Sequence, residues 1–201
     1  MGISTGQGDG GFTGLPGTAA EGSRPFRTGG VRKDDPRVEC LGALDELDAF
    51  LALCENLATK TDGAFRPKEI IGAIRKELFD TVMPGVIALN AGNVLPQTRR
   101  LEQWIAELEQ KRPVRGFIRN WGRPGAGGAA AYLNIARTVC RRAERRMASL
   151  ALPPGPAADA EREPAAEKPE CAADKPEPAY MPLLAWINRL SDLLFLLAAA
   201  E

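Results

Sequence analysis

The sequence predicts an all-α fold, a single up-and-down bundle of five helices. Five segments place apolar residues three and four positions apart, as an amphipathic helix does, and no segment alternates convincingly as a strand does. Aromatic residues make up only 6% of the chain, which disfavours β-sandwiches and barrels. The 201 residues are the length of one domain with room for a sizeable core.

The first part of the chain, residues 1–36, precedes the predicted bundle of residues 37–201. Residues 1–30 hold 10 of the 21 glycines, a composition that is costly to order and argues against a regular element. Composition alone favours a flexible tail. The alternative is a phosphate-binding loop, because glycines let backbone amides approach a phosphate and threonines add hydroxyl donors. The candidate is the run Thr5-Gly6-Gln7-Gly8-Asp9-Gly10-Gly11-Phe12-Thr13-Gly14, which does not contain a Walker A motif.

The first two helices are predicted over residues 38–57 and 67–91. Apolar residues follow helical spacing in both segments. They are Leu41, Leu44, Leu47, Leu51 and Cys54 in the first, and Ile70, Ile71, Ile74, Leu78 and Val82 in the second. Pro67 suits a first helical turn, whereas Met83-Pro84-Gly85 predicts a kink or a break.

Three more helices are predicted over residues 97–111, 129–150 and 181–200. Their apolar stripes include Leu101 and Leu108, Leu133 and Met147, and Leu190 and Leu197. Residues 152–180 combine seven prolines, eight alanines and seven acidic residues. Proline blocks helix continuation, so this low-complexity insert is expected to be a disordered loop or a semi-rigid spacer.

Composition also excludes several classes of function. The chain has no histidine, which rules out a Ser-His-Asp triad, a Cys-His dyad or a histidine metal site. Lys+Arg and Asp+Glu both number 26, a balance that argues against general nucleic-acid binding. The four cysteines form no C-x-x-C pair, so we expect no protein-built metal site. Scattered cysteines, no signal core and no bilayer-length apolar run predict a soluble cytoplasmic protein without membrane contact.

The sharpest local feature is an arginine-rich helix. Arg137, Arg141 and Arg145 are spaced by four and therefore share one helix face, and Glu144 lies among them. Such a row is often only a solvated surface. The alternative is a polyphosphate site, because guanidinium groups bind phosphate oxygens bidentately.

Two further residues allow a structural or a functional interpretation. Asp45 lies among apolar neighbours, so it is either an exposed helix carboxylate or a group that faces a partner or a site. Asn188 belongs to a polar run, Asn188-Arg189-Leu190-Ser191-Asp192, inside an apolar helix. Such a run requires hydrogen-bond partners, which are either a buried structural network or, for Asn188, a ligand.

The order of these motifs resembles the ATP:cob(I)alamin adenosyltransferases of the propanediol-utilisation type. The motifs are G-D-x-G-x-T, K-D-D-P-R-V-E, D-E-L, A-R-T-V-C-R-R-A-E-R and N-R-L-S-D-L-L-F, and together they span nearly the whole chain apart from the insert. The resemblance implies a cobalamin adenosyltransferase-like helical bundle that assembles as a homotrimer with active sites between subunits. It also implies transfer of the 5′-deoxyadenosyl group of ATP to cob(I)alamin, with release of triphosphate.

The resemblance further implies roles for individual residues. Arg141, Arg142, Glu144 and Arg145 would surround the triphosphate and its Mg²⁺, and Asn188 would contact the nucleotide. The other ATP-binding residues would be those of the N-terminal loop and one lysine: Thr5, Gly6, Gln7, Gly8, Asp9, Thr13, Gly14 and Lys33. Arg137 would form an ion pair with Asp45 of a neighbouring subunit. Trp121, 16 residues before Arg137, would crowd the lower face of the corrin, with Phe117 as its competitor for that place.

Cobalamin is the second substrate in this interpretation. A cob(II)alamin reductase and an adenosylcobalamin-dependent enzyme are expected as partners, without nucleic acid. The family's usual basic residue and threonine before Gly-Asp are replaced by Gly6 and Gln7, and its usual histidine and last-helix arginine by Asn134 and Ala199. These departures motivate the alternative of a catalytically weak or inactive cobalamin-binding or delivery protein on the same bundle.

Overall fold

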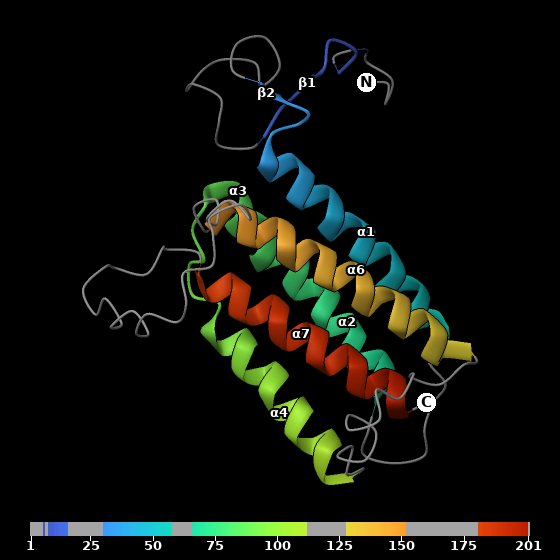
Figure 1. Cartoon of the computed structure of the whole chain (residues 1–201). Helices are drawn as coiled ribbons and strands as arrows, with labels where there is room; N and C mark the ends of the chain where they lie inside the picture. The colour runs from blue at the N-terminus through green and yellow to red at the C-terminus, as the bar shows by residue number, and fades with distance from the viewer. Residues whose placement is uncertain are drawn as a thin grey trace, which may run out of the picture.

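The computed structural model describes residues 6, 8–15, 30–57, 66–111, 128–151 and 181–200 (Figure 1). Its elements are two short strands, β1 (Phe12–Thr13) and β2 (Val31–Arg32), and the helices α1 (Pro36–Leu57), α2 (Pro67–Glu77), η1 (Leu78–Val82), α3 (Met83–Ala88), α4 (Leu95–Lys111), α6 (Gly128–Ala151) and α7 (Met181–Ala200). Because α2, η1 and α3 are continuous, the described helices form five rods. The prediction of an all-α bundle is confirmed.

The helices pack around one apolar core. α6 lies between α1 and α7, α4 packs on α7, and α2 packs on α1 (Figure 1). The side chains of Leu44, Leu47, Leu133, Trp186 and Ile187 are almost fully buried at the centre. Ion pairs join the start of α1 to the end of α6, so these two helices run antiparallel.

The junction predicted to kink at Met83-Pro84-Gly85 is a π-helical turn, η1, that runs directly into α3. Proline has no N–H to donate within the helix, and the wider turn just before Pro84 accommodates that loss. The rod ends at Ala88 rather than at residue 91, because Leu89 adopts a left-handed conformation with φ 51°. There the N–H of Asn90 donates to the carbonyl of Gly85 at 3.0 Å.

The expectation of no regular element within residues 1–30 is wrong at one point. Phe12 and Thr13 pair antiparallel with Arg32 and Val31. A ladder of two residue pairs is too short to produce the alternation that identifies a strand in a sequence.

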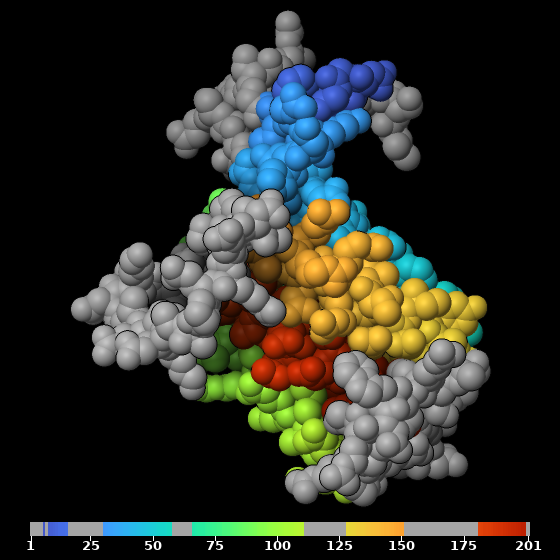
Figure 2. Space-filling view, in the orientation of Figure 1, coloured from blue at the N-terminus to red at the C-terminus, as the bar shows by residue number. Residues whose placement is uncertain are grey.

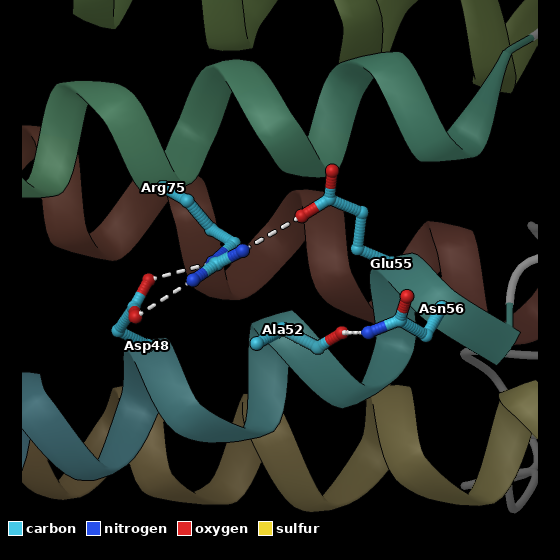
Figure 3. A network of polar contacts seen from close by, with 5 residues as sticks. All are labelled: Asp48, Ala52, Glu55, Asn56 and Arg75. Carbon is cyan, nitrogen blue, oxygen red and sulfur yellow. Dashed lines mark hydrogen bonds and ion pairs between the residues drawn. The ribbon is translucent and has the colours of Figure 1, made fainter.

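A polar network fastens α1 to α2 (Figure 3). Arg75 of α2 donates from Nε and Nη2 to the two carboxylate oxygens of Asp48, at 2.8 and 3.1 Å, and from Nη1 to Glu55 at 2.8 Å. The Asp48 side chain is only 13% exposed. The carboxylates of Asp48 and Glu55 raise the pKa of Arg75, so its guanidinium stays positively charged between the two helices.

α7 is the most apolar helix and also holds a buried polar contact. Residues 181–199 are long and apolar enough to cross a membrane by composition, but 56% of that stretch is buried within the bundle. The fold therefore explains the apolarity of α7 as core packing. Its Trp186 donates from Nε1 to Glu77 at 3.2 Å, and Arg100 of α4 lies 3.1 Å from the other Glu77 oxygen. Burial raises the pKa of Glu77.

Candidate functional site

The arginines of α6 divide into two groups. Arg142 and Arg146 are paired with carboxylates of α1, Arg142 with Glu46 and Arg146 with Glu39 at 2.9 Å. These contacts tie the last part of α6 to the first part of α1. The family resemblance places Arg142 at the triphosphate, whereas in the single chain its guanidinium is paired with Glu46.

The second group is the predicted row of Arg137, Arg141 and Arg145. Arg141 has a half-exposed side chain, 51%, and its Nη1 lies 4.0 Å from Glu144, the outer limit of an ion pair. Arg145 is exposed and forms no ion pair among the described residues. Arg137 is half-buried and donates from Nε to the amide oxygen of Asn134 at 3.0 Å. This row therefore retains guanidinium donors that could contact an anion, and the polyphosphate site stays a prediction.

α7 brings Asn188 to the level of this row. The thiol of Cys140 lies 3.4 Å from the carbonyl oxygen of Ile187, and Arg141 and Asn188 are the next residues along their helices. Asn188 is half-buried, whereas Ser191, three residues further along α7, is buried. Figure 2 shows α6 and α7 side by side on one face of the molecule. Cys140 and Ile187, 47 residues apart in sequence, thus bring the arginine motif and the polar run together where α6 packs on α7, and we call this contact the seam.

Several charged side chains act on a buried thiol at this seam. Cys140 is fully buried, and burial raises its pKa well above the usual range. The charges that act on it come from Glu144, Arg141 and Arg137 of α6 and from Asp192 of α7. Asp192 is itself paired with Arg189 at 2.6 Å. Arg189 and Asp192 of the polar run of α7 are therefore paired with each other at the surface, and half-buried Asn188 is the candidate ligand group of this run.

The glycine-rich segment folds back on Lys33. The Lys33 amide donates to the carbonyl of Gly11 at 2.9 Å, and a Cβ at Gly8 would lie 3.1 Å from Lys33 Nζ. Gly6 and Gly11 have φ values of 67° and 81°, which glycine adopts without strain. Tight turns close from Asp9 to Gly6 and from Gly11 to Gly8.

Of the other predicted loop residues, Thr13 is in β1 and Gly14 follows it, and both are half-buried. Asp35 then anchors the loop to α1 by accepting from the Arg37 amide at 2.8 Å, while its ion pair with Arg37 lowers the pKa of Asp35. Thr5 and Gln7 lie outside the described residues.

Three further predicted residues are not brought into this arrangement. Asp45 is exposed on α1, and no contact with Arg137 occurs within the described part of the single chain. Trp121 and Phe117 lie outside the described residues, as does the insert 152–180. The described residues contain no group of three acidic or cysteine side chains suited to a metal ion.

Two side chains of the site carry no functional signal of their own in the sequence. Asn134 stands out only as a departure from the family pattern, although its position three residues before Arg137 is a contact distance on a helix. For Cys140, no local signal indicates that its thiol lies against the helix of Asn188.

The fold and this seam define a class of protein, a five-helix bundle with a cationic face on α6 beside a polar residue of α7. The chain belongs to the cobalamin adenosyltransferase family, because the model of that family matches residues 3–201. It is 34% identical over 204 residues to a cobalamin adenosyltransferase of Cupriavidus metallidurans, covering 98% of this chain and 85% of that protein.

Two other comparisons concern enzymes named for corrinoids. The chain is 31% identical over 210 residues to the corrinoid adenosyltransferase PduO of Salmonella typhimurium, and it spans half the length of that protein. Its fold is similar to a variant PduO-type ATP:corrinoid adenosyltransferase from Lactobacillus reuteri complexed with cobalamin and ATP. That match has a TM-score of 0.67 and 25% identity, and it covers 98% of this chain and 89% of the other.

Proposed function

We propose that this protein transfers the 5′-deoxyadenosyl group of ATP to cob(I)alamin, forming adenosylcobalamin and releasing triphosphate. The observation that carries the proposal is the contact of Cys140 with Ile187, which places Arg141 and Asn188, the next residues along α6 and α7, at the same level of the bundle in a chain of this family. The solved relative from Lactobacillus reuteri binds both cobalamin and ATP, which supports the same pair of substrates here.

Arg141 and Arg145 of the arginine row receive the triphosphate. Arg141 and Arg145 direct exposed guanidinium groups outward and lack a close carboxylate among the described residues. Guanidinium donors in a charge-assisted contact stabilise a phosphate more strongly than neutral donors do. Arg142, Glu144 and Lys33, together with the glycine-rich loop from Thr5 to Gly14, complete the proposed set, and Asn188 contacts the nucleotide.

The reaction is a displacement at C5′ of ATP with cob(I)alamin as the nucleophile. The carbon–cobalt bond forms as the C5′–oxygen bond breaks, and the electron pair leaves with the triphosphate. The protein's tasks are to align the two reactants and to stabilise charge on the leaving triphosphate. No proton has to be abstracted, so a chain without histidine can perform this step.

Mg²⁺ fits this donor set only as a companion of ATP. The described residues offer no cluster of three acidic side chains, and Mg²⁺ is commonly held by substrate phosphates with one or two carboxylates. Glu144, beside Arg141, is the carboxylate we assign to that environment. Trp121, or Phe117 in its place, would pack against the lower face of the corrin.

A homotrimer with sites between subunits completes the proposal. Large apolar side chains are exposed on the paired helices α1 and α6: Leu53, Leu57, Tyr132 and Ile135 are 37 to 40% exposed. Burying them against a second copy is favourable, and Asp45 on α1 would then meet Arg137 of the neighbour. A cytoplasmic location, a cob(II)alamin reductase as electron source and an adenosylcobalamin-dependent enzyme as recipient are consistent with this chemistry.

The deciding experiment is anaerobic incubation of the purified protein with MgATP and chemically reduced cobalamin. We expect the cob(I)alamin spectrum to convert to that of the alkylated product, with one triphosphate released per cobalamin. A folded protein that leaves the spectrum unchanged would refute the proposal. Calorimetric binding of cobalamin without binding of ATP would instead support a delivery protein, the alternative that Gly6 and Gln7 motivate.

Assembly has its own test. Leu53→Asp combined with Ile135→Asp should convert the trimer to monomers in sedimentation velocity. Leu95→Asp is the matched control, because Leu95 is also an exposed leucine, 52%, but lies on α4. A monomeric wild-type protein would exclude the proposed assembly.

A further inference from the structure

Asn134 holds Arg137, the first arginine of the arginine row, by a side-chain hydrogen bond. Its amide oxygen accepts from Arg137 Nε at 3.0 Å, and both residues are half-buried on α6. Residues three apart on a helix are neighbours, so backbone geometry already places the two side chains together.

This contact determines which edge of the guanidinium remains available. A guanidinium presents two edges to a carboxylate or phosphate, one formed by Nε and an Nη and one formed by both Nη atoms. Asn134 occupies Nε. The Nη1–Nη2 edge therefore remains for a bidentate contact, and Arg137 has no carboxylate partner among the described residues.

We infer that Asn134 is a positioning residue that orients Arg137 so that its Nη1–Nη2 edge meets the carboxylate of Asp45 on a second copy of this chain. The inference rests on the proposed assembly. Held in this way, Arg137 forms the pair with less loss of side-chain freedom on association, because its outer torsions are already restricted in the single chain.

The contact itself is tested without any activity measurement. Arginine Nε–H resonances are visible by ¹⁵N NMR when hydrogen bonding slows their exchange. Arg137→Lys should remove one such resonance and thereby assign it, and Asn134→Ala should abolish the same resonance. Ser149→Ala is the matched control, since Ser149 is an exposed polar residue of α6 that bonds to the Arg145 carbonyl at 3.0 Å. Persistence of the signal in Asn134→Ala would overturn the inference.

The positioning role is tested by self-association. Asn134→Ala should weaken subunit association about tenfold in sedimentation equilibrium, with unchanged helix content and no such change in Ser149→Ala. Arg137 keeps its charge in this variant, so weaker association cannot come from a lost charge. Unchanged helix content excludes a folding defect as its cause. Wild-type association in a variant that has lost the resonance would overturn the positioning role.

Asn134→His gives a rescue with an internal signature, because the chain has no other histidine. The charged groups acting on this stretch of α6 and α7 are Arg137, Arg141, Glu144 and Asp192. The introduced imidazole accepts from Arg137 when it is neutral and repels Arg137 when it is protonated. Association should approach the wild-type value at about pH 8 and fall about tenfold at about pH 6 in this variant alone. A pH-independent variant would refute the inference, whereas absent adenosyl transfer with these results intact would refute only the proposed function.

Discussion

Replacing Arg141 with alanine should abolish most transferase activity while leaving the fold intact. Each charge-assisted hydrogen bond to phosphate contributes about 1.5–3 kcal/mol, so loss of both bonds of a bidentate contact costs roughly 3–6 kcal/mol. At about 1.4 kcal/mol per factor of ten, kcat/KM for ATP should fall by about two to four orders of magnitude. The folded state loses little, because Arg141 is 51% exposed and its carboxylate neighbour is 4.0 Å away.

The assay is the anaerobic conversion of cob(I)alamin at varied ATP, with urea unfolding measured in parallel. Arg66→Ala is the matched control: Arg66 is also an exposed arginine with a glutamate three residues on, Glu69 at 2.8 Å, but it lies at the start of α2. The control should retain wild-type kinetics. The phosphate-binding role of Arg141 is refuted if Arg141→Ala keeps kcat/KM within about threefold of the wild type, or if it loses activity only by unfolding.

Three other predictions concern the bundle itself. Arg75→Ala should lower the free energy of unfolding by about 2–3 kcal/mol in urea titration, because it strands the mostly buried Asp48, and a change below about 0.5 kcal/mol would contradict the network of Figure 3. Glu77→Gln should gain stability relative to the wild type as pH rises above about 4.5. Burial raises the folded pKa of Glu77 above its ordinary value of 4.5, so the ionised form opposes folding in that range. Equal pH profiles of the two proteins would exclude this assignment. Cys40, Cys54 and Cys140 should resist thiol reagents in the native state at about pH 8, as mapped by mass spectrometry, because burial raises the pKa of Cys40 to about 12 and that of Cys54 to about 11. Their rapid labelling without unfolding would contradict the buried positions.

Helix periodicity was sufficient to predict the bundle, because each rod buries one continuous apolar face. The ends are less predictable. The second rod stops at Ala88 because Leu89 adopts a left-handed conformation, which leucine in a sequence does not predict. The short β ladder near the N-terminus was missed because its pairing joins residues about 20 apart without any alternating pattern.

The candidate site was predictable as a set of residues but not as an arrangement. The four-residue spacing of the arginines is visible in the sequence and places them on one helix face. That Arg142 and Arg146 are held by α1 depends on which helix packs beside α6, which a single sequence does not encode locally. The contact of Cys140 with α7 depends in the same way on tertiary packing.

The π turn has a consequence for how the second rod tolerates insertions and deletions. Buried residues of this rod recur every four positions, at Ile70, Ile74, Leu78, Val82 and Val86, whereas an α-helix repeats about every 3.6 residues. A stripe with that spacing drifts around a regular helix, and the wider turn of η1 takes up part of the drift. Removing one residue within η1 would turn it into an ordinary α-helical turn and leave Val86 on the same side as Ile70 and Ile74, whereas inserting one residue would rotate Val86 away from the core. This segment therefore tolerates a one-residue deletion better than a one-residue insertion.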